Sequence, residues 1–115
     1  MLLDRFHTLS SGLPVRLRLA RSSDRGRIRE LLERSGAGVE PISLVHFDPR
    51  RRVVVCATAL LDGQDTVVGV GSIERGAASA DLLIADDRAD GVGELLAGVL
   101  AERSAVLAQS RSRAA

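Results

Sequence analysis

The chain contains no lysine, no tryptophan and no tyrosine, and it has two phenylalanines and one cysteine in 115 residues. Because Phe6 and Phe47 are its only aromatic residues, we expect an aliphatic core, and a base-stacking platform for single-stranded nucleic acid is excluded. The lone Cys56 rules out an internal disulfide and favours a reducing, cytoplasmic compartment. All 16 basic residues are arginine, which favours a bacterial genome of high GC content.

Long apolar runs and a strong net charge are also missing. No stretch reaches the roughly 20 apolar residues of a membrane span, and residues 1–20 do not have the layout of a signal peptide. The net charge of +1 gives no electrostatic reason for binding nucleic acid or an anionic membrane surface. With 115 residues, the chain is long enough for one domain with a modest core.

The hydrophobic pattern predicts that this domain covers residues 14–108. Residues 1–13 form a mixed leader with room for a short helix, and residues 109–115 read as a disordered tail. Apolar and charged residues alternate strictly in 14–20, which predicts a half-buried strand. The other predicted elements are a helix that starts at Ser23 or Asp24 and stops at Gly36, a helical turn near Ile42–His46, an antiparallel meander of three strands in 51–85, and a helix from Gly91.

This order of elements predicts an α/β or α+β layered fold. Both helices have one apolar stripe, so each can cover a face of a mixed, mostly antiparallel sheet of about four strands. If the chain ends at Ala115, its last strand, 81–85, is expected to form a sheet edge with no following strand beside it. An exposed apolar edge invites pairing. We therefore expect a homodimer, or a partner chain, at this edge and on the apolar surface of the last helix.

A loop with two glycines, residues 88–93, connects the last strand to the last helix. A strand, a glycine-containing turn and a helix start commonly hold a phosphate, because the first helical amides have no intrahelical acceptor. A plain turn is the alternative, with Asp90 as the helix cap that accepts a backbone N–H. From these residues alone, both interpretations remain open.

The motif Arg88-x-x-Gly91-x-Gly93 resembles the acetyl-CoA signature R/Q-x-x-G-x-G/A of the GNAT superfamily of N-acetyltransferases. The segments upstream resemble the first strand, first helix and central strands of that family, so the resemblance covers residues 14–108. It implies a GNAT-like fold and acetyl-CoA as co-substrate. It also implies direct attack on the thioester by a primary amine, which a small molecule or a protein supplies.

The resemblance further implies which residues form the site. Backbone amides of the loop would bind the CoA pyrophosphate, and the preceding strand would pair with the pantetheine arm. The residues implied for the pyrophosphate are Arg88, Ala89, Asp90, Gly91, Val92 and Gly93. Those implied for pantetheine are Leu83, Ile84 and Ala85, and a strand N–H at Ile84–Ala85 would polarise the thioester carbonyl. Glu74 is the candidate general base for the amine, or else a solvated charge beside Arg75.

Departures from the family pattern favour a second hypothesis, a catalytically inactive dimerisation or partner-binding module. Asp90 puts a carboxylate where a pyrophosphate would bind, and Ala89 replaces a usual glycine. The family's C-terminal strands and the tyrosine that often protonates the departing thiolate have no counterpart in this sequence.

Four further features are given structural interpretations. His46 is expected in a packed position beside Phe47, and Cys56 in the core. The spacing of the aspartates in 86–90 fits no metal site. The basic residues 50–52 are either solvated surface or a contact for the 3′-phosphate of CoA.

Overall fold

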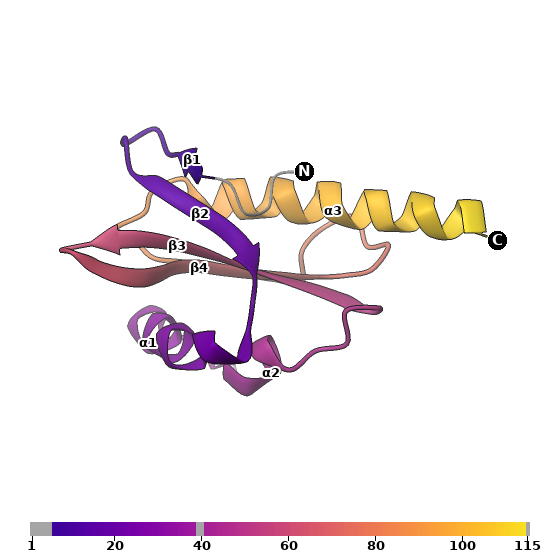
Figure 1. The fold of residues 1–115 in the computed structure, drawn as a ribbon. Helices are drawn as coiled ribbons and strands as arrows, with labels where there is room; N and C mark the ends of the chain where they lie inside the picture. The colour runs from indigo at the N-terminus through magenta and orange to yellow at the C-terminus, as the bar shows by residue number, and fades with distance from the viewer. Residues whose placement is uncertain (1–5, 39–40, 115) are drawn as a thin grey trace.

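A five-stranded antiparallel sheet lies between two helical layers in the computed structural model of the chain (Figure 1). The structure describes residues 6–38 and 41–114, with side chains as far as Ser104 in the last helix. In chain order the elements are β1 (Phe6–Thr8), β2 (Pro14–Leu19), the 3-10 turn η1 (Ser22–Asp24), α1 (Arg25–Ser35), α2 (Pro41–Val45), β3 (Arg52–Leu61), β4 (Gln64–Glu74), β5 (Leu82–Ala85) and α3 (Val92–Ala114). The layered α+β class and the antiparallel meander are confirmed.

The strands are arranged in chain order, β1-β2-β3-β4-β5, so β5 is an edge strand of the described sheet. The helices α1 and α2 cover one face, and α3 covers the other (Figure 1). Because helices lie on both sides, β3 and β4 are buried along most of their length. On the α3 side the largest fully buried side chains include Val15, Leu17, Val55, Val68, Ile73, Leu96 and Leu100; on the α1 side they include Ile28, Leu31, Val54, Val67 and Val70.

Two glycines of β4 bring α3 close to the sheet. A Cβ at Gly69 would lie 2.8 Å from Cδ1 of Leu96, and one at Gly71 would lie 2.6 Å from Cδ1 of Leu100. Side-chain carbons do not approach this closely. The two glycines therefore set the height of α3 over the sheet, and with it the position of the loop that leads into α3.

The hairpin between β3 and β4 has a two-residue connection. Asp62 and Gly63 both have positive φ, 51° and 77°, as a type I′ turn requires. Its strands run through the centre of the sheet, with a register shift between Ala57 and Thr58. The Asp-Gly pair thus explains why the predicted turn forms at this point.

Both ends of the domain differ from the expectation. Residues 6–8, part of the predicted leader, form β1 beside β2, which is why the sheet has five strands rather than about four. At the other end α3 continues to Ala114, through most of the residues expected to form a tail. Residues 1–5 and 115 lie outside the described part of the chain. None of the helices in the described part combines the length and apolarity that a membrane crossing requires.

An ion pair inside the fold connects β2 to the start of α1. The Asp24 carboxylate is fully buried and accepts hydrogen bonds from Arg18, at 2.6 and 2.5 Å, and from the Arg21 amide at 2.7 Å. Burial opposes ionisation of Asp24, but these donors outweigh it and hold its pKa below the usual value. Asp24 is the cap residue of α1, one of the two predicted positions, but its carboxylate makes no cap hydrogen bond to that helix and instead accepts the Arg21 amide and pairs with Arg18.

Candidate functional site

Residues 86–91 form a tight loop between β5 and α3, held by backbone hydrogen bonds. The Asp86 amide donates to the Val68 carbonyl at 2.8 Å, the Ala89 amide to that of Asp86 at 3.0 Å, and the Val92 amide to that of Ala89 at 3.1 Å. The side chains of Ala89 and Val92 are buried and their amides are used in these bonds, so neither residue offers a ligand the N–H group that the resemblance implied.

The start of α3 leaves backbone N–H groups available. The first α-helical bond runs from the Leu95 amide to the Gly91 carbonyl at 3.2 Å, which makes Gly91, with φ 93°, the cap residue. Within the described residues, the amides of Gly93 and Glu94 have no acceptor. The alternative prediction that Asp90 caps the helix is wrong, because Asp90 precedes the cap and is exposed.

The Asp86 carboxylate holds the loop through hydrogen bonds. It accepts the Arg88 amide at 2.9 Å and two bonds from the Arg88 guanidinium at 3.1 and 2.9 Å. Arg34, in the last turn of α1, reaches the same carboxylate at 3.2 Å. The hydrogen bonds from Arg88 lower the pKa of Asp86 to about 2, so the carboxylate is ionised at neutral pH.

Sequence reasoning missed this role of Asp86 and Arg34. The two residues lie 52 positions apart, and neither has a local pattern that points to the other. Together with Arg88 they line a hollow of about 420 Å³ between α1 and the end of β5. Arg88 is half exposed and its guanidinium is already bound to Asp86. A ligand at the loop would therefore meet an arginine that a carboxylate has partly neutralised.

The predicted pantetheine residues lie beside the loop. In β5 the Ile84 side chain enters the core, whereas Leu83 and Ala85 are exposed. A Cβ at Gly93 would be 3.8 Å from the Cβ of Ala85, in ordinary contact, so the strand and the helix start adjoin. The described sheet has no strand beyond β5, and its outer backbone edge is open.

Glu74 lies at the other end of β4. Val70 pairs with Ile84, four positions before Glu74, so about 13 Å of strand separates Glu74 from the predicted polarising N–H groups. The loop adjoins Val68, which is about 20 Å from Glu74 along the same strand. The structure therefore does not bring Glu74 together with Ile84–Ala85. Glu74 is nearer the start of β5, where Leu82 pairs with Ser72.

The basic residues 50–52 also lie at the Glu74 end. Arg52 is opposite Glu74 in the β3–β4 register, and its guanidinium forms an ion pair with the Glu74 carboxylate at 3.3 Å. A contact between this cluster and a 3′-phosphate held near residues 88–93 does not fit, because the loop adjoins Val68, about 20 Å along β4 from Glu74.

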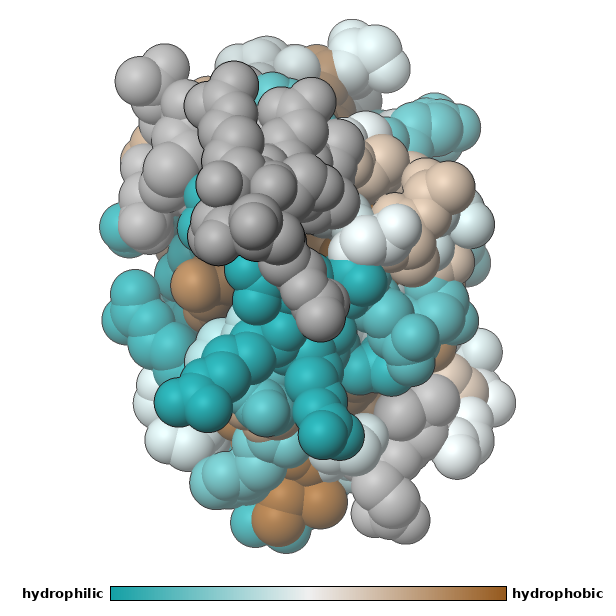
Figure 2. Space-filling model, turned by 90° about the vertical axis from the view of Figure 1, so that its right-hand side faces the viewer, coloured by the Kyte–Doolittle hydropathy of each residue, from teal (hydrophilic) through white to brown (hydrophobic). Residues whose placement is uncertain are grey.

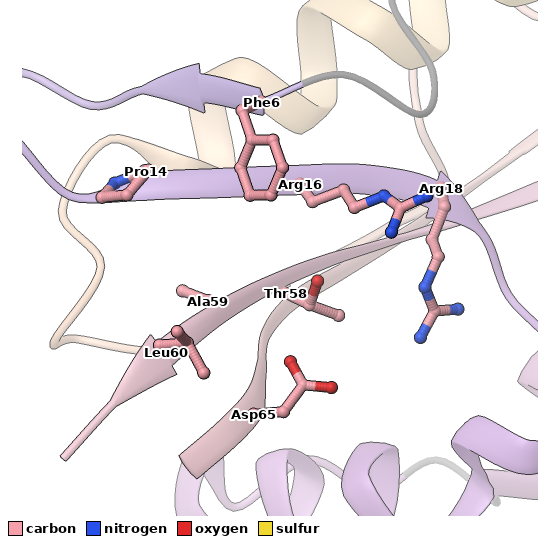
Figure 3. Close-up of a pocket in the computed structure, with 8 residues that line it drawn as sticks. All are labelled: Phe6, Pro14, Arg16, Arg18, Thr58, Ala59, Leu60 and Asp65. Atoms are coloured by element: carbon pink, nitrogen blue, oxygen red, sulfur yellow. The ribbon is translucent and has the colours of Figure 1, made fainter. Parts of the chain in front are cut away.

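A second hollow, of about 240 Å³, lies on the α1 side of the sheet at the β1–β2–β3 corner (Figure 3). Phe6 and Leu60 on its rim are 72% and 69% exposed. Its charged residues are already engaged: Arg18 binds Asp24, Asp65 pairs with Arg27, and Arg16 also has a partner. This hollow offers apolar surface but no uncommitted charge.

The remaining candidates have simpler roles. Cys56 is a core residue as predicted, and burial raises the pKa of its thiol to about 12, so it is not a nucleophile. His46 follows α2 and is exposed rather than packed. In the part of the chain that the structure describes, no cluster of histidine, cysteine and carboxylate side chains could hold a metal ion.

Comparison of the chain with protein-family models, curated proteins and solved structures found no match.

Proposed function

We propose that the chain is a cytoplasmic, acetyl-CoA-dependent N-acetyltransferase that acts on a primary amine. One observation carries the proposal. The open edge of β5 leads directly to a helix start where the amides of Gly93 and Glu94 lack an acceptor. An extended ligand with an anionic end suits this arrangement, because its arm can pair with the strand while its charge lies at the helix N-terminus. The resemblance of residues 88–93 to the acetyl-CoA signature supports the same ligand.

The proposed binding mode fixes the direction of CoA. The pyrophosphate accepts hydrogen bonds from the Gly93 and Glu94 amides, and the pantetheine arm extends along β5 from Ala85 towards Leu82. The thioester then lies near Leu82, further from the loop than the Ile84–Ala85 position expected from the sequence. Ser72, opposite Leu82, is two positions from Glu74.

The reaction needs few groups from the protein. The amine nitrogen attacks the carbonyl carbon of the thioester, so a C–N bond forms as the C–S bond breaks. Glu74 accepts the proton of the amine, directly or through one water molecule. The CoA thiolate takes its proton from water. A backbone N–H on the open edge of β5 stabilises the negative charge on the carbonyl oxygen.

Calorimetric titration of acetyl-CoA into wild type and two glutamate variants tests the binding mode. Gly93→Glu puts a negative charge beside the proposed pyrophosphate site, while an acidic residue in the first turn favours the helix. Gly98→Glu makes the same change on the exposed side of α3, where nothing lies within 4 Å of an added Cβ. We expect Gly93→Glu to weaken binding roughly tenfold or more, and Gly98→Glu to bind like wild type.

Equal binding of acetyl-CoA to both variants would refute the pyrophosphate site. Melting curves of the two variants serve as the control for loss of folding. Release of CoA thiol in the presence of a panel of primary amines tests the transfer step. Thiol release no faster than hydrolysis with every amine would refute the acetyltransferase.

The exposed β5 edge favours a second candidate, a catalytically inactive module that binds a second copy of itself or a partner chain. Leu83 on this edge is 43% exposed. Leu83→Arg should abolish association measured by light scattering, while Leu60→Arg, an exposed site on β3, should not. A monodisperse wild-type monomer at micromolar concentration would contradict this candidate.

A further inference from the structure

Four arginines surround a hollow at the end of the sheet where β3 begins and β4 ends. This arginine hollow has a volume of about 500 Å³ and is lined by Arg50, Arg51, Arg52, Glu74 and Arg75. Figure 2 looks onto this end of the molecule and shows hydrophilic side chains gathered across its middle. The lining brings together two residues of the turn before β3, the first residue of β3, the last residue of β4 and the residue that follows it.

Arg52 is the fixed member of the group. Its guanidinium donates to Ser72 Oγ at 2.8 Å, to Asp81 at 2.5 Å and to Glu74 at 3.3 Å. The Ser72 hydroxyl itself donates to Asp81 at 2.7 Å, which closes the network. Arg52 therefore holds Glu74 in place at the rim and has little capacity left for a ligand.

Arg75 is held in place by hydrogen bonds, but one of its side-chain donors has no acceptor. Its backbone amide donates to the Arg51 carbonyl at 2.8 Å, and its Nη1 donates to the Arg50 carbonyl at 3.2 Å. Its Nε is buried and is the single buried side-chain nitrogen or oxygen in the described part of the chain without a hydrogen-bond partner. A buried N–H of a cation that lacks an acceptor is costly, so Arg75 carries a donor that nothing in the described part of the chain satisfies.

Arg50 and Arg51 supply the exposed donors. Among the described residues, the Arg50 guanidinium has no partner, and Arg51, 89% exposed, has only Asp48 at 4.0 Å. The Arg50 amide donates to Asp48 Oδ1 at 2.9 Å, and the Arg51 and Arg52 amides donate to the Asp48 carbonyl. This turn presents both side chains at the rim without using their guanidiniums.

Acidic neighbours offset most of the positive charge. Asp48, Glu74 and Asp81 all lie close to the arginines. Selectivity would therefore come from directed N–H donors rather than from net charge. A guanidinium presents N–H donors in a fixed plane, and these match two oxygens of a carboxylate or phosphate group. A point charge has no such directional preference.

We infer that the arginine hollow binds an oxyanion group and that, if the proposed function holds, this group belongs to the amine acceptor. The second step follows from position. The proposed binding mode brings the thioester to the start of β5, and Glu74 is both the proposed base and part of the hollow's lining. An acceptor anchored there by a carboxylate or a phosphate would place its amine beside Glu74.

A binding experiment without acetyl-CoA tests the oxyanion site itself. Inorganic phosphate, pyrophosphate and acetate are titrated separately into the protein by calorimetry, in a buffer free of phosphate and carboxylate. Wild type should bind at least one of them saturably at millimolar concentration. Comparing the three shows whether the site prefers phosphate or carboxylate.

Variants locate that binding. Arg50→Gln and Arg51→Gln remove exposed guanidiniums, and each should weaken binding roughly tenfold. Arg75→Lys keeps the charge but removes the Nε donor, and should weaken binding similarly. Arg29→Gln, an exposed arginine of α1, is the matched control and should bind like wild type. Absence of saturable binding in wild type, or unchanged binding in the three hollow variants while they melt like wild type, overturns the oxyanion site.

A transfer experiment tests the acceptor. O-phosphoethanolamine, β-alanine and ethanolamine share an aminoethyl group and end in a phosphate, a carboxylate and a hydroxyl. With acetyl-CoA, one of the anionic amines should react with a higher kcat/KM than ethanolamine, and Arg50→Gln should remove the difference. Equal kcat/KM for all three overturns the acceptor assignment but not the acetyltransferase. Oxyanion binding without transfer to any amine refutes the proposed function and leaves the oxyanion site supported.

Discussion

Leu100 of α3 lies directly over Gly71 of β4. A Cβ at Gly71 would be 2.6 Å from Cδ1 of Leu100 and 3.0 Å from Cδ2 of Leu83, so the two neighbours leave no room for a methyl group. Gly71 and Leu100 therefore act as one packing unit. Their contact fixes how α3 sits on the sheet, and α3 carries the amides of the candidate site.

Gly71→Ala should destabilise the protein by roughly 1–3 kcal/mol through overpacking, measured by urea unfolding. Leu100→Ala removes the clashing atom. The double variant should therefore lose less stability than the sum of the two single variants. Additive losses would mean that Gly71 and Leu100 do not pack as the structure shows. Gly98→Ala, on the open side of α3, is the control and should gain up to about 1 kcal/mol from helix propensity.

Asp24→Ala should lower the free energy of unfolding by about 3–5 kcal/mol. Only 11% of the Arg18 side chain is exposed, and the substitution leaves its charge without a partner. Asp65→Ala breaks the pair with Arg27, in which both side chains are about half exposed, and should cost less than about 1 kcal/mol. Chemical denaturation of both variants measures the difference. Similar losses would show that the Arg18–Asp24 pair is no more important than a surface pair.

Acid should destabilise the fold through Asp86. Its folded pKa of about 2 lies below the unfolded value, so its stabilising contribution is complete above about pH 4 and is lost as the pH falls towards 2. Asp86→Asn cannot lose this contribution, so its stability should fall less steeply over that range. The check is the free energy of unfolding of both proteins at several pH values. Parallel curves would contradict the assignment.

Ser104→Ala should destabilise the protein by about 1–3 kcal/mol, because it leaves a loop amide without its acceptor. The buried Ser104 hydroxyl accepts the Gly76 amide at 3.0 Å and donates to the Ala77 carbonyl at 2.9 Å. Since this serine ties α3 to the β4–β5 loop, hydrogen exchange at Gly76 should also accelerate. Ser104→Thr, which keeps the hydroxyl, is the informative comparison. Unchanged exchange at Gly76 in Ser104→Ala would contradict the contact.

The sheet and its helices were largely predictable from the sequence because their signals are local. Alternation in residues 14–20 and the Asp62–Gly63 turn define β2 and the central hairpin, and Gly36, with φ 72°, ends α1 where expected. The strand β1 was missed because it has three residues and depends on its pairing with β2. No periodicity can be detected in so short a segment.

The candidate site was less predictable because its contacts connect distant segments. The loop 88–93 was located correctly between β5 and α3, but Asp86 was not recognised as the partner of Arg34 and Arg88. The cap was also misassigned, since Asp90 is a common cap residue and Gly91 takes that position by backbone conformation. Such choices depend on tertiary distances that spacing along the chain does not encode.

The β3–β4 hairpin also has a consequence for how the chain folds. Its two long strands are joined by only two residues. Their pairing therefore closes a short loop, which costs little conformational entropy. Isolated hairpins form in about 1–10 μs, much faster than most domains fold. The central strands can therefore pair before β2, β5 and the helices dock on them. We expect residues near the Asp62–Gly63 turn to have the highest φ-values in the folding transition state.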